Sequence, residues 1–505
     1  MLSPMVAEEA EVSDLPVSMG RTVAIITCIT CITGIGNLLG GLLTVSIPVI
    51  AADLQIPPEL QLWPAAAFAL ACGCTLLPCG AIADVLGCRR ACLLGGFFQA
   101  ASALGAGLAR TSTQLIALRG AAGLAASFCL PGAVGVAAQA FPLSSSPRRR
   151  SAAFAAMGGG QAVGFGLGLA LGGVFSDTVG WRWGFYTTAL LNGAVLALAL
   201  WALPVRGTHG QAEAALTRLA RDVDWIGALL SSTSLALLSY ALGLATAPGA
   251  AQSMRQPLHL VLLSTALALL PAFYWWTRRQ TCLARPALIP TTLWANMAFT
   301  AICVTVFLVW GALNASEQLT ALYLQDVRGT SSLTASLYFM PAPICGALMN
   351  AAIGVLLPSL RPSLAVPVAC FVSGVAPLLL AMLCHVDGPG YWRGVFQAMA
   401  LNPLGADLIY TIANLVVTAA FPARTQALAG GVFNMLAQIG KSVGIATSAV
   451  IARQVTAQGD GAGSKEALLR GYKAAWWYNC SLGFVSVAVS FWGLRGVGKL
   501  GVKRE

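Results

Sequence analysis

Charged side chains in apolar stretches are the residues of this sequence that could do chemistry. Arg119, Asp407 and Lys441 lie within such stretches, and Glu317 stands at the end of one. A charge at the centre of a bilayer costs about 2.5–3.5 kcal/mol on insertion scales, so charges found there usually bind ligands, form ion pairs or move protons. A carboxylate can take up and release a proton, and a cation can hold an anionic group. The four residues therefore predict proton handling or ligand recognition within a membrane.

Two hypotheses stand for Arg119 and two for Glu317. If Arg119 faces the protein interior, it can orient a carboxylate or enolate of a bound molecule, or hold a proton-carrying group in place. If it only stands near the start of its segment, its long side chain can extend to the membrane surface. Glu317 and Gln318 end the ninth apolar segment. A solvated helix end and a role in a cavity are equally open for this acid.

Asp407 and Lys441 are predicted to lie at equal depth and to pair. They stand at nearly equal distances from the short loop near 421–425, on consecutive antiparallel segments. Because a helix rises about 1.5 Å per residue, equal distances from the turn mean similar depth. The pair either fastens two helices, or Asp407 takes a proton when the pair separates. It would then replace an acid that is absent from the first segment.

Uncharged polar residues mark the remaining candidates for a substrate or proton pathway. Most such groups in membrane helices hydrogen-bond neighbouring helices, so only a minority is expected to touch a substrate. The residues are Asn37, Thr44, Ser46, Gln161, Asn402, Asn414, Asn434 and Gln438, of which Asn37, Gln161, Asn434 and Gln438 are the preferred ones.

The composition predicts the elements that must position these residues. Hydrophobic residues make up 57% of the 505 and charged residues only 9%, whereas soluble proteins carry roughly 25% charged residues. At about 20 residues per crossing, the chain holds fourteen apolar segments. They lie near 22–50, 62–83, 92–109, 115–138, 152–175, 183–203, 225–245, 257–276, 296–319, 333–357, 364–384, 394–419, 428–452 and 473–494.

These segments predict an all-α polytopic membrane protein with two six-helix bundles and two extra helices. We assign residues 1–21 to a cytosolic tail, 22–203 to the first bundle and 296–494 to the second bundle. Residues 204–295 form a cytosolic linker, the two extra helices and a basic loop, and 495–505 form a cytosolic tail. With alternate loops placed inward, roughly 18 of the 29 Lys and Arg residues face the cytosol, which agrees with the positive-inside rule.

The sequence carries no pattern for a cofactor, a metal or a nucleic acid. The net charge of +11 comes from basic residues between apolar runs, not from one basic face. The 14 cysteines lie mostly in apolar segments with only three histidines in the chain, so we interpret them as small packing residues. No Walker sequence indicates ATP use, and no catalytic motif indicates an enzyme.

The loop between the second and third segments carries the most specific pattern. Gly80 and Asp84 share a helix face, Gly87 can take the positive φ that ends a helix, and Arg89 and Arg90 mark a cytosolic loop. The pattern resembles the loop signature of the major facilitator superfamily, Gly-x-x-x-Asp-x-x-Gly-x-Arg-Arg. Because Asp84 stands one turn after Gly80 at the cytosolic rim, we expect its carboxylate to accept hydrogen bonds from a neighbouring helix end or arginine and so to lock the cytosolic side when the transporter faces outward.

Two further segments resemble signatures of the same superfamily. Arg119 and Gly123 match Arg-x-x-Gln-Gly, with Ala122 in place of the glutamine. The fifth segment matches the antiporter signature Gly-x-x-x-Gly-Pro-x-x-Gly-Gly, except that Leu169 replaces the proline. Its glycines are expected to give a smooth face against which the opposite bundle rocks, and they are Gly164, Gly168, Gly172 and Gly173.

The stretches Gly180–Tyr186 and Asp224–Gly227 resemble the fourteen-helix drug:proton antiporter branch, and the stretches 285–296, 414–452 and 493–505 resemble its fungal members. Trp181 and Trp183 are expected to form an aromatic girdle at the membrane interface. The resemblance implies a monomeric pump in the plasma membrane, or alternatively the vacuolar membrane, that exports a toxin, drug or secondary metabolite by proton antiport. The alternatives are a proton-coupled or facilitative transporter of a small polar solute such as ammonium or an amine, a membrane enzyme, and a nutrient sensor.

Overall fold

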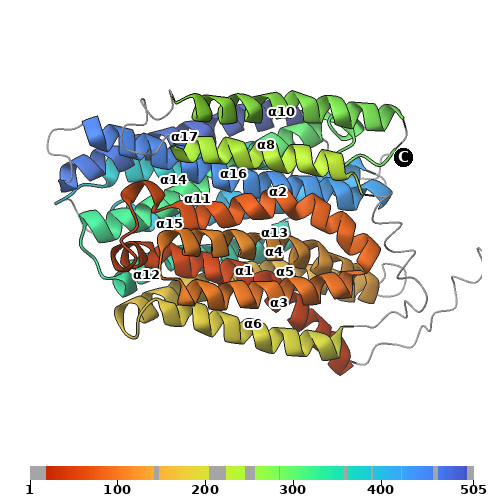
Figure 1. Cartoon of the computed structure of the whole chain (residues 1–505), viewed down its shortest axis with the longest axis horizontal. Coiled ribbons are helices and arrows are strands. Elements are labelled where there is room, and N and C mark those ends of the chain that lie inside the picture. Colours follow the sequence, from red (N-terminus) through yellow and green to blue (C-terminus); the bar gives the residue numbers. More distant parts are fainter. Residues whose placement is uncertain are drawn as a thin grey trace, which may run out of the picture.

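The computed structural model describes residues 19–141, 147–203, 223–244, 256–283, 285–356, 361–387, 391–421, 423–458 and 464–496. Every regular element in these ranges is a helix, and the helices run roughly along one axis (Figure 1). Within the described residues, eleven spans are long and apolar enough to cross a membrane. The expected tails and linker fall largely at 1–18, 204–222 and 497–505, outside the described residues.

Six helices form the first bundle, and close pairing of particular helices holds it together. The first helix packs on the fifth, the second and third pack on the fourth, and the third packs on the sixth. The helices are α1 (Met19–Asp53), α2 (Trp63–Leu86), α3 (Cys88–Leu108), α4 (Ser112–Ala140), α5 (Pro147–Asp177) and α6 (Arg182–Ala202).

The second bundle repeats these pairings. Here α11 packs on α16, α13 and α14 pack on α15, and α14 packs on α17. If α12 and α13 are counted as one crossing interrupted near Met340, this bundle also contains six crossings. The elements are α11 (Met297–Leu322) continued by the π-helix η5 (Tyr323–Val327), α12 (Ser332–Phe339), α13 (Pro341–Leu356), α14 (Pro362–Leu383), α15 (Val395–Ala420), α16 (Ala423–Gln458) and α17 (Lys465–Leu494).

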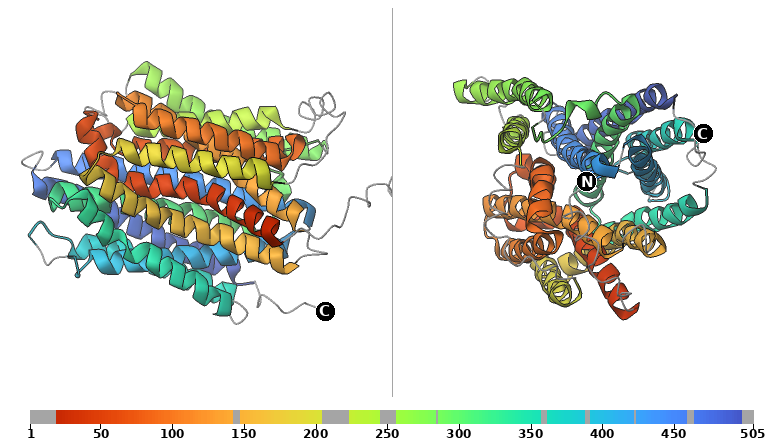
Figure 2. Two further views of the ribbon diagram at one scale, coloured as in Figure 1. Left: turned by 90° about the horizontal axis from the view of Figure 1, so that it is seen from below. Right: turned by 90° about the vertical axis from the view of Figure 1, so that its right-hand side faces the viewer.

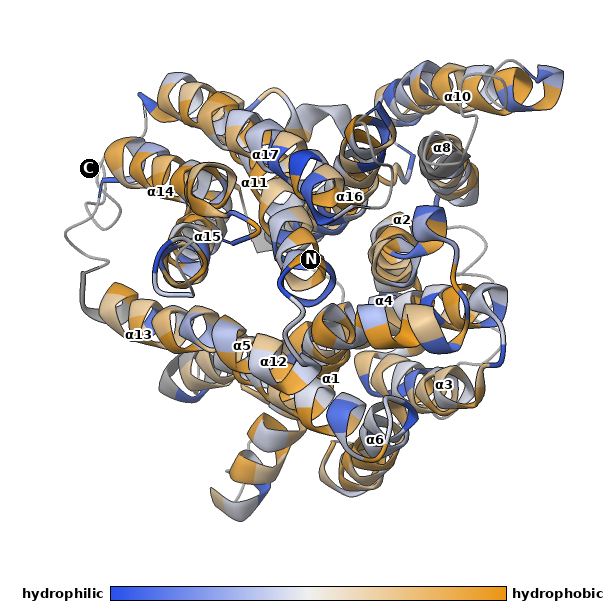
Figure 3. Ribbon diagram, turned by 90° about the vertical axis from the view of Figure 1, so that its left-hand side faces the viewer, coloured by the Kyte–Doolittle hydropathy of each residue, from blue (hydrophilic) through white to orange (hydrophobic). Residues whose placement is uncertain are grey.

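Two extra helices, α8 (Trp225–Leu244) and α10 (Pro257–Cys282), complete the fourteen crossings. They pack on each other, and α8 also packs on α2 and α16, which belong to different bundles. In the end-on views both helices stand at the outer edge of the molecule (Figure 2, Figure 3). The extra pair therefore lies along one seam between the bundles.

Asp224 attaches this pair to the rest of the chain. Its carboxylate accepts hydrogen bonds from the Gly227 N–H at 2.8 Å, which caps the start of α8, and from the Trp276 indole of α10 at 2.9 Å. A third comes from the backbone N–H of Leu288 at 3.1 Å, in the loop that leads to α11. One side chain thus joins two helices and a loop.

We expect Asp224→Ala to loosen the extra helices. The substitution leaves two backbone donors and one indole donor without their acceptor, and one lost hydrogen bond to a charged group costs about 1.5–3 kcal/mol. Thermal unfolding of the purified protein should show a lower melting temperature. The exposed Asp387 provides the matched control, and equal melting of Asp224→Ala and Asp387→Ala would contradict the attachment role.

The segments predicted from sequence differ from the helices mainly at their ends. The ninth segment, predicted at 296–319, continues through Leu322 and the π-helical turn to Val327. Asn296 caps its start by accepting from the Phe299 N–H, as expected for a helix N-terminus. Because the helix is longer than predicted, Glu317 stands inside it and not at its end.

Candidate functional site

Arg119 is held inside the first bundle by the close contact of α4 with α2. An added Cβ on Gly123, one turn later, would collide with the Phe68 carbonyl oxygen and lie 3.1 Å from the Cys72 backbone nitrogen, so only glycine permits this approach. Arg119 is 2% exposed. Its Nε donates to the Pro64 carbonyl at 3.2 Å, and its guanidinium lies 4.6 Å from the centre of the Phe68 ring. The arginine is buried, so the alternative in which it extends to the membrane surface is wrong.

One terminal nitrogen of this guanidinium, Nη1, is buried without a hydrogen-bond partner. A buried donor without an acceptor costs about 1–3 kcal/mol, more if charged. A ligand oxygen that accepts a hydrogen bond from Nη1 would therefore remove this energetic cost.

Glu317 is the buried acid of the second bundle. It is 7% exposed, and its Oε1 accepts from Nδ2 of Asn402 at 3.2 Å, a residue of α15 that is 2% exposed. The interpretation of Glu317 as a solvated helix end is thus corrected. Asn402 hydrogen-bonds a neighbouring helix, as was expected of most polar residues.

Lys441, near the middle of α16, faces Glu317. The α11–α16 contact is close, since an added Cβ on Gly311 would lie 2.8 Å from the Gly440 carbonyl oxygen. The Lys441 ammonium interacts electrostatically with Glu317, with Arg119 and with the Cys72 thiol. Among the described residues, no carboxylate lies within the 4.0 Å of a direct ion pair with it.

The predicted pair of Asp407 with Lys441 is absent. Asp407 instead accepts a hydrogen bond from Nδ2 of Asn350 on α13 at 3.1 Å. The depth argument considered only distance from the loop, whereas the rotation of each helix decides which neighbour a side chain meets. Asp407 is turned toward α13, and Lys441 is turned toward α11 and the first bundle.

The other predicted pathway residues do not gather into one hydrogen-bonded group. Asn37 donates to Thr33 of its own helix at 3.5 Å, and Asn434 accepts from the Tyr410 hydroxyl at 3.4 Å. Gln161 and Gln438 are half-buried. The side chain of Asn414 lies outside the described residues. The remaining two residues lie on α1 and contact other helices. Thr44 accepts a hydrogen bond from Gln318 of α11 at 2.8 Å, and Ser46 donates to the Gly172 carbonyl of α5 at 3.4 Å.

Most of the antiporter glycines face a different partner from the one predicted. Gly164, Gly168 and Gly172 pack against the backbone of α1 in the same bundle. Only Gly173 meets the opposite bundle, where an added Cβ would lie 3.0 Å from Cα of Leu333. The glycine face of α5, which was predicted to contact the opposite bundle, thus mainly forms the contact between α5 and α1 inside the first bundle. The spacing indicated close packing but could not show which helix would approach.

The loop signature adopts part of the expected geometry. Gly87 has φ +95° and ends α2, as predicted, and Gly80 lies in ordinary contact with Pro131 of α4. Arg89 donates to the Leu200 carbonyl at the end of α6 at 2.9 Å. Asp84 is exposed, and no described residue hydrogen-bonds its carboxylate, so the expected lock is not formed in this structure. Arg90 is exposed as well.

The opposite end of the molecule carries contacts between the bundles that the sequence did not predict. The Asp177 carboxylate at the end of α5 accepts from the backbone N–H groups of Ser332 and Leu333, at 3.2 and 2.8 Å. Gln325 of η5 donates to the Val45 carbonyl of α1 at 2.8 Å. An ion pair of 3.0 Å joins Arg453 of α16 to Glu59 before α2.

We expect Asp177→Ala to favour opening of this end. The carboxylate caps the first turn of α12, where the helix dipole also attracts negative charge. Loss of one charge-assisted contact, about 1.5–3 kcal/mol, shifts a two-state equilibrium tenfold or more. Spin labels at the exposed Val179 and Leu337 should report a larger population of long distances. The control is Asp387→Ala, which removes an exposed acid in the loop after α14. Unchanged distances in Asp177→Ala would contradict the idea that Asp177 holds this end of the bundles together.

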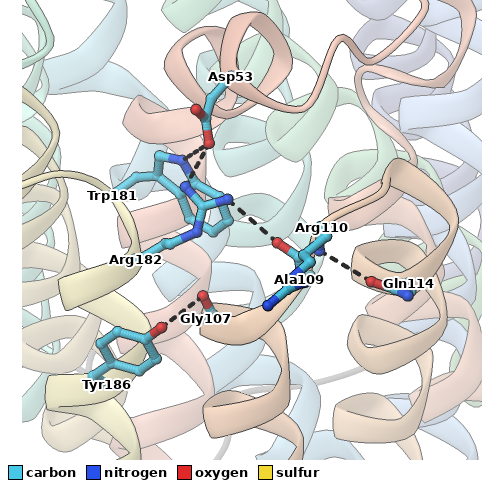
Figure 4. A network of polar contacts seen from close by, with 8 residues as sticks. All are labelled: Asp53, Gly107, Ala109, Arg110, Gln114, Trp181, Arg182 and Tyr186. Atoms are coloured by element: carbon cyan, nitrogen blue, oxygen red, sulfur yellow. Dashed lines mark hydrogen bonds and ion pairs between the residues drawn. The ribbon is translucent and has the colours of Figure 1, made fainter.

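A second network at this end is internal to the first bundle (Figure 4). Asp53 at the end of α1 forms an ion pair with Arg182 and accepts from the Trp181 indole at 3.0 Å. Arg182 also donates to Ala109, and the Tyr186 hydroxyl donates to Gly107 at 3.0 Å. The predicted girdle is therefore only half right, because Trp183 is exposed whereas Trp181 is 3% exposed. This network fastens α1, α3 and α6 and is distinct from the charges around Glu317.

Comparison with known proteins agrees with this architecture. A family model described as Major Facilitator Superfamily matches residues 26–445. The chain belongs to the major facilitator superfamily. This facilitator is therefore a membrane transporter and not an enzyme.

Its relatives have several names. MFS-type transporter 1 of Pyricularia oryzae is 35% identical, over 95% of this chain and 85% of the relative. Efflux pump terJ of Aspergillus terreus is 25% identical over 83% and 77%, and a low affinity ammonium transporter of Saccharomyces cerevisiae is 25% identical over 85% and 79%. The solved structure of an auto-inhibited POT family peptide transporter matches the fold with a TM-score of 0.69 at 17% identity, over 96% of this chain and 99% of that one.

Proposed function

We propose that this facilitator exports a small organic molecule, a toxin, drug or secondary metabolite, by proton antiport with alternating access. We place it in the fungal fourteen-helix drug:proton antiporter branch and in the plasma membrane, as a monomer. The observation that carries the proposal is the buried Glu317 carboxylate beside Lys441, where α11 meets α16.

Glu317 supplies a proton site that does not depend on an acid in the first helix. Its oxygen is fixed by Asn402, and its charge is offset by Lys441 at a depth where an isolated charge costs about 2.5–3.5 kcal/mol. Protonation removes the attraction between Glu317 and Lys441 and thereby changes how firmly α11 and α16 are held. Asp407, bonded to Asn350, is the second candidate for a proton carrier.

Alternating access requires two arrangements of the bundles. The contacts of Asp177, Gln325 and Glu59 hold the bundles together at one end, and they must break when that end opens. The loop signature around Asp84 lies at the other end, and its lock is expected to form in the alternate arrangement. A proton on Glu317 and a bound substrate would each bias this equilibrium.

The names of the relatives support export and also provide the alternative. One is called an efflux pump and another an ammonium transporter. The charges near Glu317 disfavour an ammonium or amine substrate, because the Lys441 cation lies beside this carboxylate and the Arg119 cation lies near Lys441.

Proton counterflow in proteoliposomes tests the proposal. Vesicles containing the purified protein and a trapped pH dye are each given one compound. Four compounds are anthraquinones: the unsubstituted molecule and its hydroxymethyl, carboxylate and aminomethyl derivatives, all substituted at the same ring position. The fifth compound is ammonium chloride. Antiport predicts that at least one anthraquinone moves protons in the opposite direction, and protein-free vesicles are the control. Counterflow with ammonium chloride alone would favour the alternative, and no counterflow with any compound would refute export by antiport.

A further inference from the structure

Charged residues follow one another from Glu317 to Lys441 and from Lys441 to Arg119, and they offer hydrogen-bonding groups that the protein itself does not use. Nη1 of Arg119 is buried without a partner, and the Lys441 ammonium has none among the described residues. Oε1 of Glu317 is taken by Asn402, while no described residue donates to its other oxygen. Arg119 and Glu317 are 2% and 7% exposed, so their unused groups belong to the interior, and Lys441 between them is half-buried. The site therefore presents cationic donors and one anionic acceptor.

Three classes of ligand can be compared by charge. A cation would meet the carboxylate but be repelled by both Arg119 and Lys441. An anion would be attracted by the two cations, yet its negative charge would repel ionised Glu317. Binding of an anion therefore favours protonation of Glu317, and by linkage the proton favours the anion. The anion and the proton would then be carried together in one direction, whereas antiport requires that binding of the substrate excludes binding of the proton.

An uncharged ligand with both kinds of polar group avoids this conflict. Its carbonyl oxygen can accept from Arg119 or Lys441, and its hydroxyl can donate to ionised Glu317. A proton on Glu317 weakens that acceptor, because hydrogen bonds to charged groups are worth about 1.5–3 kcal/mol and neutral ones about 0.5–1.5 kcal/mol. Substrate and proton then compete for the same carboxylate.

The groups that surround Glu317 agree with this competition. Its charged neighbours are Lys441 from α16 and, beyond it, Arg119 from α4, with the Cys72 thiol of α2 also near Lys441. From α15 it meets the uncharged Asn402. On α1 and α17, Thr44 and Asn479 bond the adjacent residues Gln318 and Ser316 and carry no charge.

We infer that the substrate is an uncharged molecule that carries a hydroxyl donor beside a carbonyl acceptor, recognised by Glu317 together with Arg119 and Lys441. The inference rests on the proposed antiport. It identifies the substrate by its polar groups, and it excludes amines and carboxylates as preferred substrates.

Binding of the same four anthraquinones to the purified protein by calorimetry tests the inference. The hydroxymethyl compound should bind most tightly to the wild-type protein. In Glu317→Gln, which mimics the protonated acid, its affinity should fall about tenfold, whereas the affinity for the carboxylate compound should rise. These opposite changes cannot come from misfolding, which would weaken both. Glu466→Gln, at an exposed acid in the first turn of α17, should leave both affinities unchanged.

The outcomes separate the inference from the proposed function. Tightest binding of the carboxylate or the aminomethyl compound, or no preference among the four, overturns the inference even if proton counterflow persists. Parallel changes of both affinities in Glu317→Gln also overturn it. Absence of proton counterflow with every compound would instead overturn antiport itself.

Discussion

Replacement of Glu317 by glutamine is expected to abolish proton-driven export while the protein still folds and reaches the membrane. Glutamine keeps the shape and an oxygen that can accept from Asn402, but it cannot take up or release a proton. We expect proton counterflow in proteoliposomes to fall at least about tenfold, the effect of losing about 1.4 kcal/mol of coupling. In the wild-type protein, counterflow should depend on the imposed pH gradient, and in the variant it should not.

Two variants make this result interpretable. Glu466→Gln removes an exposed acid elsewhere and should retain full counterflow. Asp407→Asn removes another acid that stands within a crossing of the second bundle. If Glu317→Gln remains coupled while Asp407→Asn does not, the proton carrier is Asp407, and the assignment to Glu317 is wrong.

Gly168→Ala is expected to disrupt the first bundle. An added Cβ at Gly168 would lie 2.8 Å from the Leu38 carbonyl carbon and 2.9 Å from the Leu42 nitrogen, and it would meet the Leu38 oxygen more closely still. These are backbone atoms of α1, so no side-chain rotation can make room and α5 must move away. Overpacking of this kind costs typically 1–3 kcal/mol, and we expect a lower melting temperature and a reduced yield of folded protein.

Gly159→Ala is the matched control on the same helix. An added Cβ there meets nothing within 4 Å, and alanine is the better helix former by about 1 kcal/mol. It should leave stability unchanged or raise it. If both variants melt alike, the α1–α5 contact is less tight than the structure indicates.

Much of the architecture could be predicted because it depends on patterns that are local in sequence. Apolar segments of about 20 residues must be helices in lipid, where every backbone group needs a partner within its own segment. The turn at Gly87 could be predicted for the same reason, since a positive φ is a property of one residue. Helix ends such as Val327 were less predictable, because a π-helical turn adds residues beyond the apolar run.

The sequence predicted which residues belong to the site but not which of them contact one another. Arg119, Glu317 and Lys441 stood out as charges in or beside apolar segments, whereas their grouping depends on how three helices, α4, α11 and α16, are rotated about their axes. Depth alone suggested Asp407 as the partner of Lys441, and rotation gave Asp407 to Asn350 instead. Asp177 escaped notice because an acid near a loop is unremarkable until the helix start that it caps is known.

The position of α8 has a consequence for lipids. Since α8 packs against both α2 and α16, it covers the seam between the bundles on that side and keeps acyl chains away from it. On the other side the seam is formed by α5 with α12 and α13, without an added helix among the described residues. A membrane-dissolved compound that approaches sideways from the bilayer would thus meet the extra helices on one side and the bundle helices themselves on the other. The extra pair of helices makes the molecule asymmetric toward the lipid while the bundles themselves remain a repeated pair.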